Sequence, residues 1–154
     1  MSEPTASTSD FARILIAADS PLEALTIENM LRGAGHRDIR VTSDAREIVA
    51  MHEKWPFKVL VLDMGIRSLG SLDVLNRLSD QINHRQLAVL ALTQAGDEIM
   101  QERALGAGAM DVFARPFTRS ETLIRVAGAL ASLPGPTTDE AIMRAVRRRF
   151  AAVL

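Results

Sequence analysis

The chain has 154 residues, a formal net charge of −1, 47% hydrophobic residues, 24% charged residues and no cysteine. These values are typical of one globular domain with its own core, and the charge gives no general attraction to nucleic acid or to an anionic membrane. The lack of cysteine excludes disulfides, thiolate metal sites and cysteine nucleophiles. No apolar stretch is long enough to span a bilayer, and the amino terminus lacks the pattern of a signal peptide, so we expect a cytoplasmic protein.

The first elements follow a disordered lead that we expect over residues 1–11, which are rich in Ser, Thr and Pro. A strand is predicted over Arg13–Ala17. The next residues, Ser20-Pro21-Leu22-Glu23, match a helix start in which serine is the N-cap, proline is the first helical residue and glutamate completes a capping box. This helix should run to about Arg32, where glycines end it.

The centre of the fold is predicted to be the strand Lys58–Leu62. A short strand at Ile39–Thr42 and a helix from Asp44 toward Lys54 come before it. The strand itself is a continuous apolar run, which is typical of a strand buried on both faces of a parallel sheet. It ends in Asp63. A carboxylate there lies at the edge of the sheet where open α/β folds bind ligands.

The rest of the domain continues the alternation of strands and helices. We expect a helix from Ser71, a strand over Leu87–Leu92, a helix over Asp97–Leu105, a strand over Met110–Phe113 and a helix from Thr118 through Leu130. Five strands that alternate with five helices predict a parallel sheet with helices on both faces. Residues 134–154 should form a linker and an amphipathic C-terminal helix, which packs on its own domain or a second copy, or leads toward an output domain.

Polar residues follow four of the five predicted strands, namely Asp19, Asp63, Thr93 and Arg115. Two carboxylates suit Mg²⁺, which takes one or two carboxylates and keeps several waters. A hydroxyl and a cation suit the oxygens of a phosphoryl group. One such residue is most simply a helix cap or a solvated turn, but four in this order predict a site for phosphoryl transfer onto Asp63.

The stretches RILIAADSP, VLVLDMGI, LALTQ, ERALGAGAMD and ARPF make residues 12–133 resemble the receiver domain of bacterial two-component response regulators. The resemblance implies a flavodoxin-like, doubly wound α/β fold with strand order 2-1-3-4-5. It implies a signalling module in a phosphorelay, not an enzyme, with a histidine kinase or phosphotransfer protein as its partner. A homodimer through the last helices is possible by the same resemblance; neither nucleic acid nor a membrane is expected as a partner.

The resemblance also assigns roles to the residues at the strand ends. Asp63 is the phosphoryl acceptor. Asp19, Asp63 and the backbone carbonyl of Gly65 are the Mg²⁺ ligands, while Thr93 and Arg115 contact the phosphoryl group.

Five positions depart from the family pattern, and they lie at or near this site. Ala18 replaces an acidic residue, Arg115 a lysine, Val112 an aromatic residue, Arg67 a proline and Ser71 a glycine. Losing the acid predicts weak Mg²⁺ binding. Arginine is longer than lysine and bidentate, so it could pair with the acceptor aspartate in the resting state or still reach a phosphoryl oxygen. Valine has no ring to swing, so the usual aromatic readout is lost.

Two functional hypotheses follow from this pattern. In the first, the acceptor aspartate is still phosphorylated and the readout differs; we favour it because Asp63, Asp19 and Thr93 are all present. In the second, the chain is a phosphorylation-independent pseudo-receiver that serves as a binding or dimerisation module. A flavin- or nucleotide-binding protein of the same fold is disfavoured, because the loop after the first strand carries Asp19 where a phosphate would sit.

Overall fold

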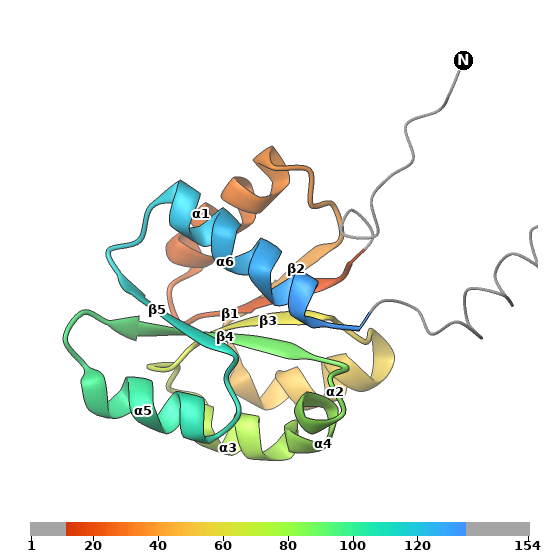
Figure 1. The fold of residues 1–154 in the computed structure, drawn as a ribbon, viewed down its shortest axis with the longest axis vertical. Helices are drawn as coiled ribbons and strands as arrows, with labels where there is room; N and C mark the ends of the chain where they lie inside the picture. The colour runs from red at the N-terminus through yellow and green to blue at the C-terminus, as the bar shows by residue number, and fades with distance from the viewer. Residues whose placement is uncertain (1–11, 135–154) are drawn as a thin grey trace, which may run out of the picture.

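The structure is a computed structural model that describes residues 12–134. Five parallel strands form one sheet in the order β2-β1-β3-β4-β5 (Figure 1). The strands are β1 (Ile14–Ala17), β2 (Ile39–Thr42), β3 (Val59–Asp63), β4 (Ala88–Gln94) and β5 (Asp111–Arg115). The predicted doubly wound α/β fold and its strand order are confirmed. The predicted lead over residues 1–11 and the predicted C-terminal helix lie outside the described residues.

Helices cover both faces of this sheet. They are α1 (Pro21–Gly33), α2 (Ile48–Lys54), α3 (Ser71–Arg77), α4 (Ser79–Asn83), α5 (Glu98–Gly106) and α6 (Arg119–Ser132), with a 3-10 turn at Ala45–Glu47. Figure 1 shows α1 and α6 together on one face and α2 to α5 on the other. Across residues 12–134, no helix has the length and apolar character needed to cross a membrane.

The sequence predicted five helices, whereas the described chain has six. The difference arises after Ser71, where one continuous helix was expected and two short ones form. Leu78, between α3 and α4, has φ −97° and ψ 7°, which is outside the helical range. Its side chain is only 1% exposed, so it still packs in the core.

The central strand β3 is buried along its whole length. Leu60 and Leu62 belong to the hydrophobic cluster on the side of α2, α3 and α5. Val59 and Val61 belong to the opposite cluster, which includes residues of α1 and α6. Because the strand is packed from both faces, the residue at its carboxyl end has little freedom to move.

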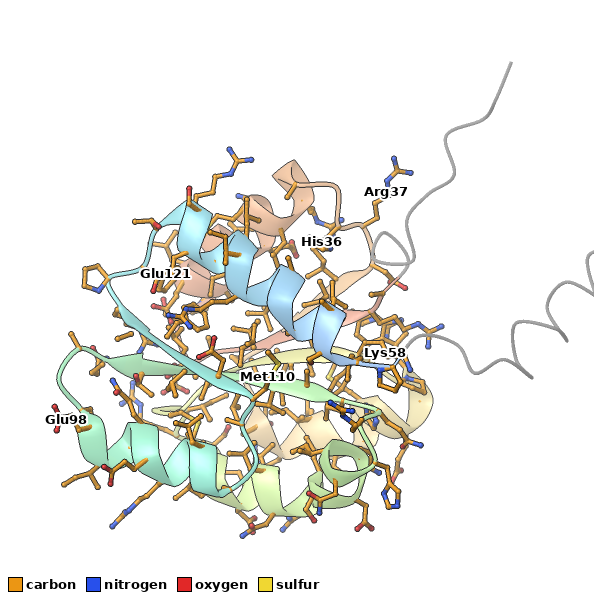
Figure 2. The ribbon with its side chains drawn as sticks, viewed as in Figure 1. His36, Arg37, Lys58, Glu98, Met110 and Glu121 are labelled. Atoms are coloured by element: carbon orange, nitrogen blue, oxygen red, sulfur yellow. The ribbon has the colours of Figure 1, made fainter. Side chains whose placement is uncertain are left out.

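Different residues lie at the two ends of the sheet, where the strands begin and where they end. Figure 2 shows Lys58 at the amino end of β3, on one side of the molecule, and Glu98 and Glu121 on the other, in the first turns of α5 and α6. Trp55, which comes shortly before β3, is 6% exposed, and the guanidinium carbon of Arg40 lies 4.5 Å from its ring centroid. Trp55 is therefore a core residue whose ring makes a cation–π contact with Arg40.

Candidate functional site

The site lies where β1 and β3 end. Asp63 is the last residue of β3 and is 6% exposed. Its Oδ1 accepts a hydrogen bond from the backbone N–H of Gly65 at 2.9 Å. Its Oδ2 accepts a longer one from the backbone N–H of Asp19 at 3.4 Å. Because β1 and β3 are paired neighbours, residues that follow them meet at this edge, as the sequence predicted.

A guanidinium group faces the carboxylate of Asp63. Arg115, the last residue of β5, places Nη2 3.1 Å from Oδ1 of Asp63. The same group donates from Nε and Nη2 to the two carboxylate oxygens of Glu23, at 2.7 and 2.6 Å. These bonds to Glu23, more than the contact with Asp63, raise the pKa of Arg115 above its usual value. Arg115 therefore stays charged and joins two carboxylates.

The predicted metal ligand Asp19 is paired with a second arginine. Its Oδ1 accepts from the backbone N–H of Arg67 at 3.1 Å, and its Oδ2 accepts from Nε of Arg67 at 3.0 Å. The backbone hydrogen bond is the largest cause, and the guanidinium the next, of a lowered pKa at Asp19. The carboxylate is therefore ionised, but both of its oxygens are already occupied.

Thr93 lies near the end of β4 and is 2% exposed. Its neighbour in the strand, Leu92, is paired with Asp63 across the sheet, which puts Thr93 at the same end of the sheet as Asp63. The hydroxyl of Thr93 accepts a long hydrogen bond, 3.4 Å, from the amide of Gln101 in α5. Because the hydroxyl acts as an acceptor there, its own proton is available to another oxygen.

The residues at this edge fit a weakly held Mg²⁺. Within residues 12–134 no group of three or more acidic or histidine side chains is arranged around one point. Asp19 and Asp63 with the Gly65 carbonyl nonetheless offer the two carboxylates and one carbonyl that Mg²⁺ accepts when water completes its shell. The side chain of Arg67 would have to turn away from Asp19. It is 90% exposed, so this costs little.

Two other departures from the family pattern are placed beside the site. The hydroxyl of Ser71 donates to the carbonyl oxygen of Met64 at 2.8 Å, and so ties the start of α3 to the residue after Asp63. Val112 is half-buried and packs against the core on the α5 side. The structure thus gives Ser71 a local structural role and shows no aromatic ring at position 112.

Two residues of the site were not predicted from the sequence to belong to it. Glu23 was expected only to complete a capping box; its N–H does bond to the Ser20 hydroxyl at 3.2 Å, but its carboxylate goes to Arg115. Arg67 was noted only as a replaced proline. The position of Glu23 near the site could have been predicted, because the helix after β1 begins at the same end of the sheet as Asp19. An arginine at position 115 also needs a carboxylate partner.

Removing the arginine that covers Asp19 should strengthen Mg²⁺ binding. We expect Arg67→Ala to lower the Mg²⁺ dissociation constant by about two- to fivefold, because an exposed ion pair is worth only a few tenths of a kcal/mol to 1 kcal/mol. Isothermal titration calorimetry measures this. Arg46→Ala is the matched control, since Arg46 binds Asp44 in a similar way and Asp44 is not a predicted Mg²⁺ ligand. Equal constants for Arg67→Ala and the unaltered chain would contradict the prediction.

Comparisons with known proteins agree with this geometry. Residues 14–127 match the model of the response regulator receiver domain. The Rhizobium etli protein named "Probable chemotaxis protein CheY" is 24% identical over 106 residues, which cover 69% of this chain and 82% of that one. The Mycobacterium tuberculosis transcriptional regulatory protein KdpE is 31% identical over 119 residues, covering 76% of this chain and 50% of that one.

A solved structure shows the same fold. The response regulator receiver domain protein of Clostridium thermocellum superposes with a TM-score of 0.70 at 24% identity, covering 79% of this chain and 95% of that one. The present chain spans about half the length of the mycobacterial regulator KdpE. The family model covers well over half of the chain, and the five-stranded sheet has the strand order predicted for that family. The chain belongs to the family of response regulator receiver domains, the signalling modules of two-component systems.

Proposed function

We propose that Asp63 accepts a phosphoryl group from a histidine kinase or a phosphotransfer protein, and that the chain signals through protein contacts without turning over a free substrate. The observation that carries this proposal is the burial of the Asp63 carboxylate together with its two contacts. It is 6% exposed, fixed at Oδ1 by the Gly65 N–H, and faced by the cation of Arg115. A buried carboxylate held this way at a ligand-binding edge is a prepared nucleophile.

The proposed step uses the less occupied oxygen of the acceptor. Within residues 12–134, Oδ2 of Asp63 has one long hydrogen bond, whereas Oδ1 has a short one and an ion pair. Oδ2 attacks phosphorus; the new O–P bond forms as the P–N bond of the donor phosphohistidine breaks, and the released imidazole nitrogen takes a proton from solvent. Arg115 and the hydroxyl of Thr93 would bind the phosphoryl oxygens as charge builds on them.

Mg²⁺ is part of this proposal, with Asp19, Asp63 and the Gly65 carbonyl as its ligands. When bound, it would neutralise charge between the carboxylate and the incoming phosphoryl group. We infer weak binding, because Ala18 supplies no carboxylate and Asp19 is paired with Arg67. The same proposal includes a cytoplasmic location, where kinase, nucleotide and Mg²⁺ occur together.

The test is intact-protein mass spectrometry after incubation with Mg²⁺ and a small-molecule phosphodonor. We expect a gain of one phosphoryl group in the unaltered chain and none in Asp63→Asn, which has the same shape but lacks the nucleophilic carboxylate. An unchanged gain in the variant would move the acceptor elsewhere. No gain in the folded chain with Mg²⁺ in excess would favour the pseudo-receiver, in which the cation of Arg115 stands in for the charge of the metal beside Asp63.

The face built from α5, β5 and α6 is the partner surface we propose, with a second copy of the chain as its occupant. Large apolar side chains are exposed there: Ile99, Leu105, Met110 and Ile124. Figure 2 shows Met110 at the start of β5, between the two helices. Met110 and Ile124 line a shallow groove beside Asp111 and Arg125, which form an ion pair. Apolar side chains next to charges of both signs suit a self-complementary contact.

Placing a charge in this groove should weaken association. Ile124 is 70% exposed, so Ile124→Glu does not disturb the core. We expect the dimer dissociation constant to rise about 5- to 30-fold, because one buried hydrophobic contact at an interface is worth roughly 1–2 kcal/mol. Sedimentation velocity over a concentration series measures it. Leu22→Glu, at an equally exposed site on α1, is the control, and a monomeric unaltered chain would contradict the proposal.

A further inference from the structure

The arginine at the site is held by a second carboxylate. Glu23 binds Nε and Nη2 of Arg115 at 2.7 and 2.6 Å, in the two-bond arrangement that matches a guanidinium fork to a carboxylate. The same Nη2 lies 3.1 Å from Oδ1 of Asp63. The side chains of Arg115, Glu23 and Asp63 are 21%, 20% and 8% exposed, so most of the surface of all three side chains is shielded from solvent.

The backbone around Glu23 fixes its position. Glu23 is in the first turn of α1, where Ser20 caps the helix and Pro21 begins it. The Ser20 hydroxyl accepts the N–H of Glu23 itself at 3.2 Å. Arg115, by contrast, reaches the site on a long side chain with several rotatable bonds, at the last residue of β5. Such a side chain loses much conformational entropy when one geometry is required of it.

We propose that Glu23 is a positioning residue for phosphoryl transfer, which orients the guanidinium of Arg115 toward the acceptor carboxylate. The inference rests on the proposed function of Asp63. Both oxygens of Glu23 are engaged by Arg115, so the residue acts through the arginine and does not replace the carboxylate that Ala18 lacks. A lysine at position 115 has no planar fork for a carboxylate to bind at two points. The role of Glu23 therefore follows from the arginine in this chain.

The experiment is a double-mutant cycle on the rate of phosphorylation by a small-molecule phosphodonor at saturating Mg²⁺, followed by intact mass. Glu23→Gln keeps the size of the side chain and removes its charge. With Arg115 present, we expect Glu23→Gln to slow phosphorylation by about 2- to 10-fold, the cost of ordering one long side chain. In the Arg115→Lys background the same substitution should change the rate by less than about twofold.

Controls separate positioning from a structural role. Glu28→Gln alters a carboxylate on the same helix that pairs with Arg32 instead, and it should leave the rate unchanged. Glu23→Asp keeps the charge on a shorter side chain and should recover part of the rate. Equal effects of Glu23→Gln in both backgrounds, or faster phosphorylation with Arg115 present, would overturn the inference while leaving Asp63 as acceptor. No mass gain in any chain would overturn the proposed function, and this inference with it.

Discussion

We expect Thr93→Ala to slow phosphorylation of the chain by on the order of 100-fold at saturating Mg²⁺, the effect typical of removing one well-placed donor from the site of a developing negative charge. Thr93 is 2% exposed, and its hydroxyl accepts the Gln101 amide while its own proton remains free to reach a phosphoryl oxygen. A donor in such a dry environment acts more strongly than one in water. The rate of mass gain in the presence of a phosphodonor measures the effect.

Serine at the same position provides the control. Thr93→Ser keeps the hydroxyl and loses only a methyl group, so it should retain most of the rate. If serine and alanine lower the rate equally, the methyl group or the packing of β4 matters, and the hydroxyl does not contact the phosphoryl group. Circular dichroism and urea denaturation of both variants show whether the fold is intact.

We expect Arg115→Ala to destabilise the chain by about 2 kcal/mol in the absence of Mg²⁺. Removing one partner of a buried ion pair costs roughly 3–5 kcal/mol, and the one-fifth exposure of Arg115 reduces that figure. The variant leaves Glu23 and Asp63 without the cation that joins them. Urea denaturation measures the loss. Arg77→Ala, which breaks an exposed pair with Asp73 on α3, should cost no more than about 0.5 kcal/mol.

The same variant should respond more strongly to Mg²⁺ than the unaltered chain does. With the arginine gone, the metal is the remaining counter-charge for Asp63 and meets no competing guanidinium there. A ligand that binds only the folded state at ten times its dissociation constant adds about 1.4 kcal/mol of stability. We therefore expect Mg²⁺ to restore a substantial part of the loss. An equal Mg²⁺ response in both chains would show that Arg115 and the metal do not compete for Asp63.

Much of the fold could be predicted because its local signals agree. The apolar run before Asp63 indicated a strand buried on both faces, and β3 is buried at every residue. Ser20 was expected to cap a helix and Thr118 to begin one, and each hydroxyl accepts the N–H three residues later. The break at Leu78 was missed, because Leu72, Leu75 and Leu78 keep helical spacing up to it and only the backbone angles change there.

The positions of the candidate site and the pairing of Arg115 with Asp63 could be predicted, but the other two ion pairs of the site could not. Strand ends place Asp19, Asp63, Thr93 and Arg115 at one edge whatever their side chains do, since topology fixes them there. Which carboxylate each arginine binds depends on rotamers and on contacts 48 and 92 residues apart in sequence. The sequence predicted that Arg115 could pair with Asp63, and the ion pair is present. The bonds of Arg115 to Glu23 and of Arg67 to Asp19 required the tertiary structure.

The buried, arginine-stacked tryptophan at the opposite edge of the sheet has a practical consequence for spectroscopy. The chain has one tryptophan and no tyrosine, so Trp55 supplies nearly all of its intrinsic fluorescence. The indole lies before β3, and Asp63 lies at the far end of that strand. Its emission should therefore change sharply when the protein unfolds in urea and hardly at all when Mg²⁺ or a phosphoryl group binds. Fluorescence thus reports the stability of every variant above without interference from occupancy of the site.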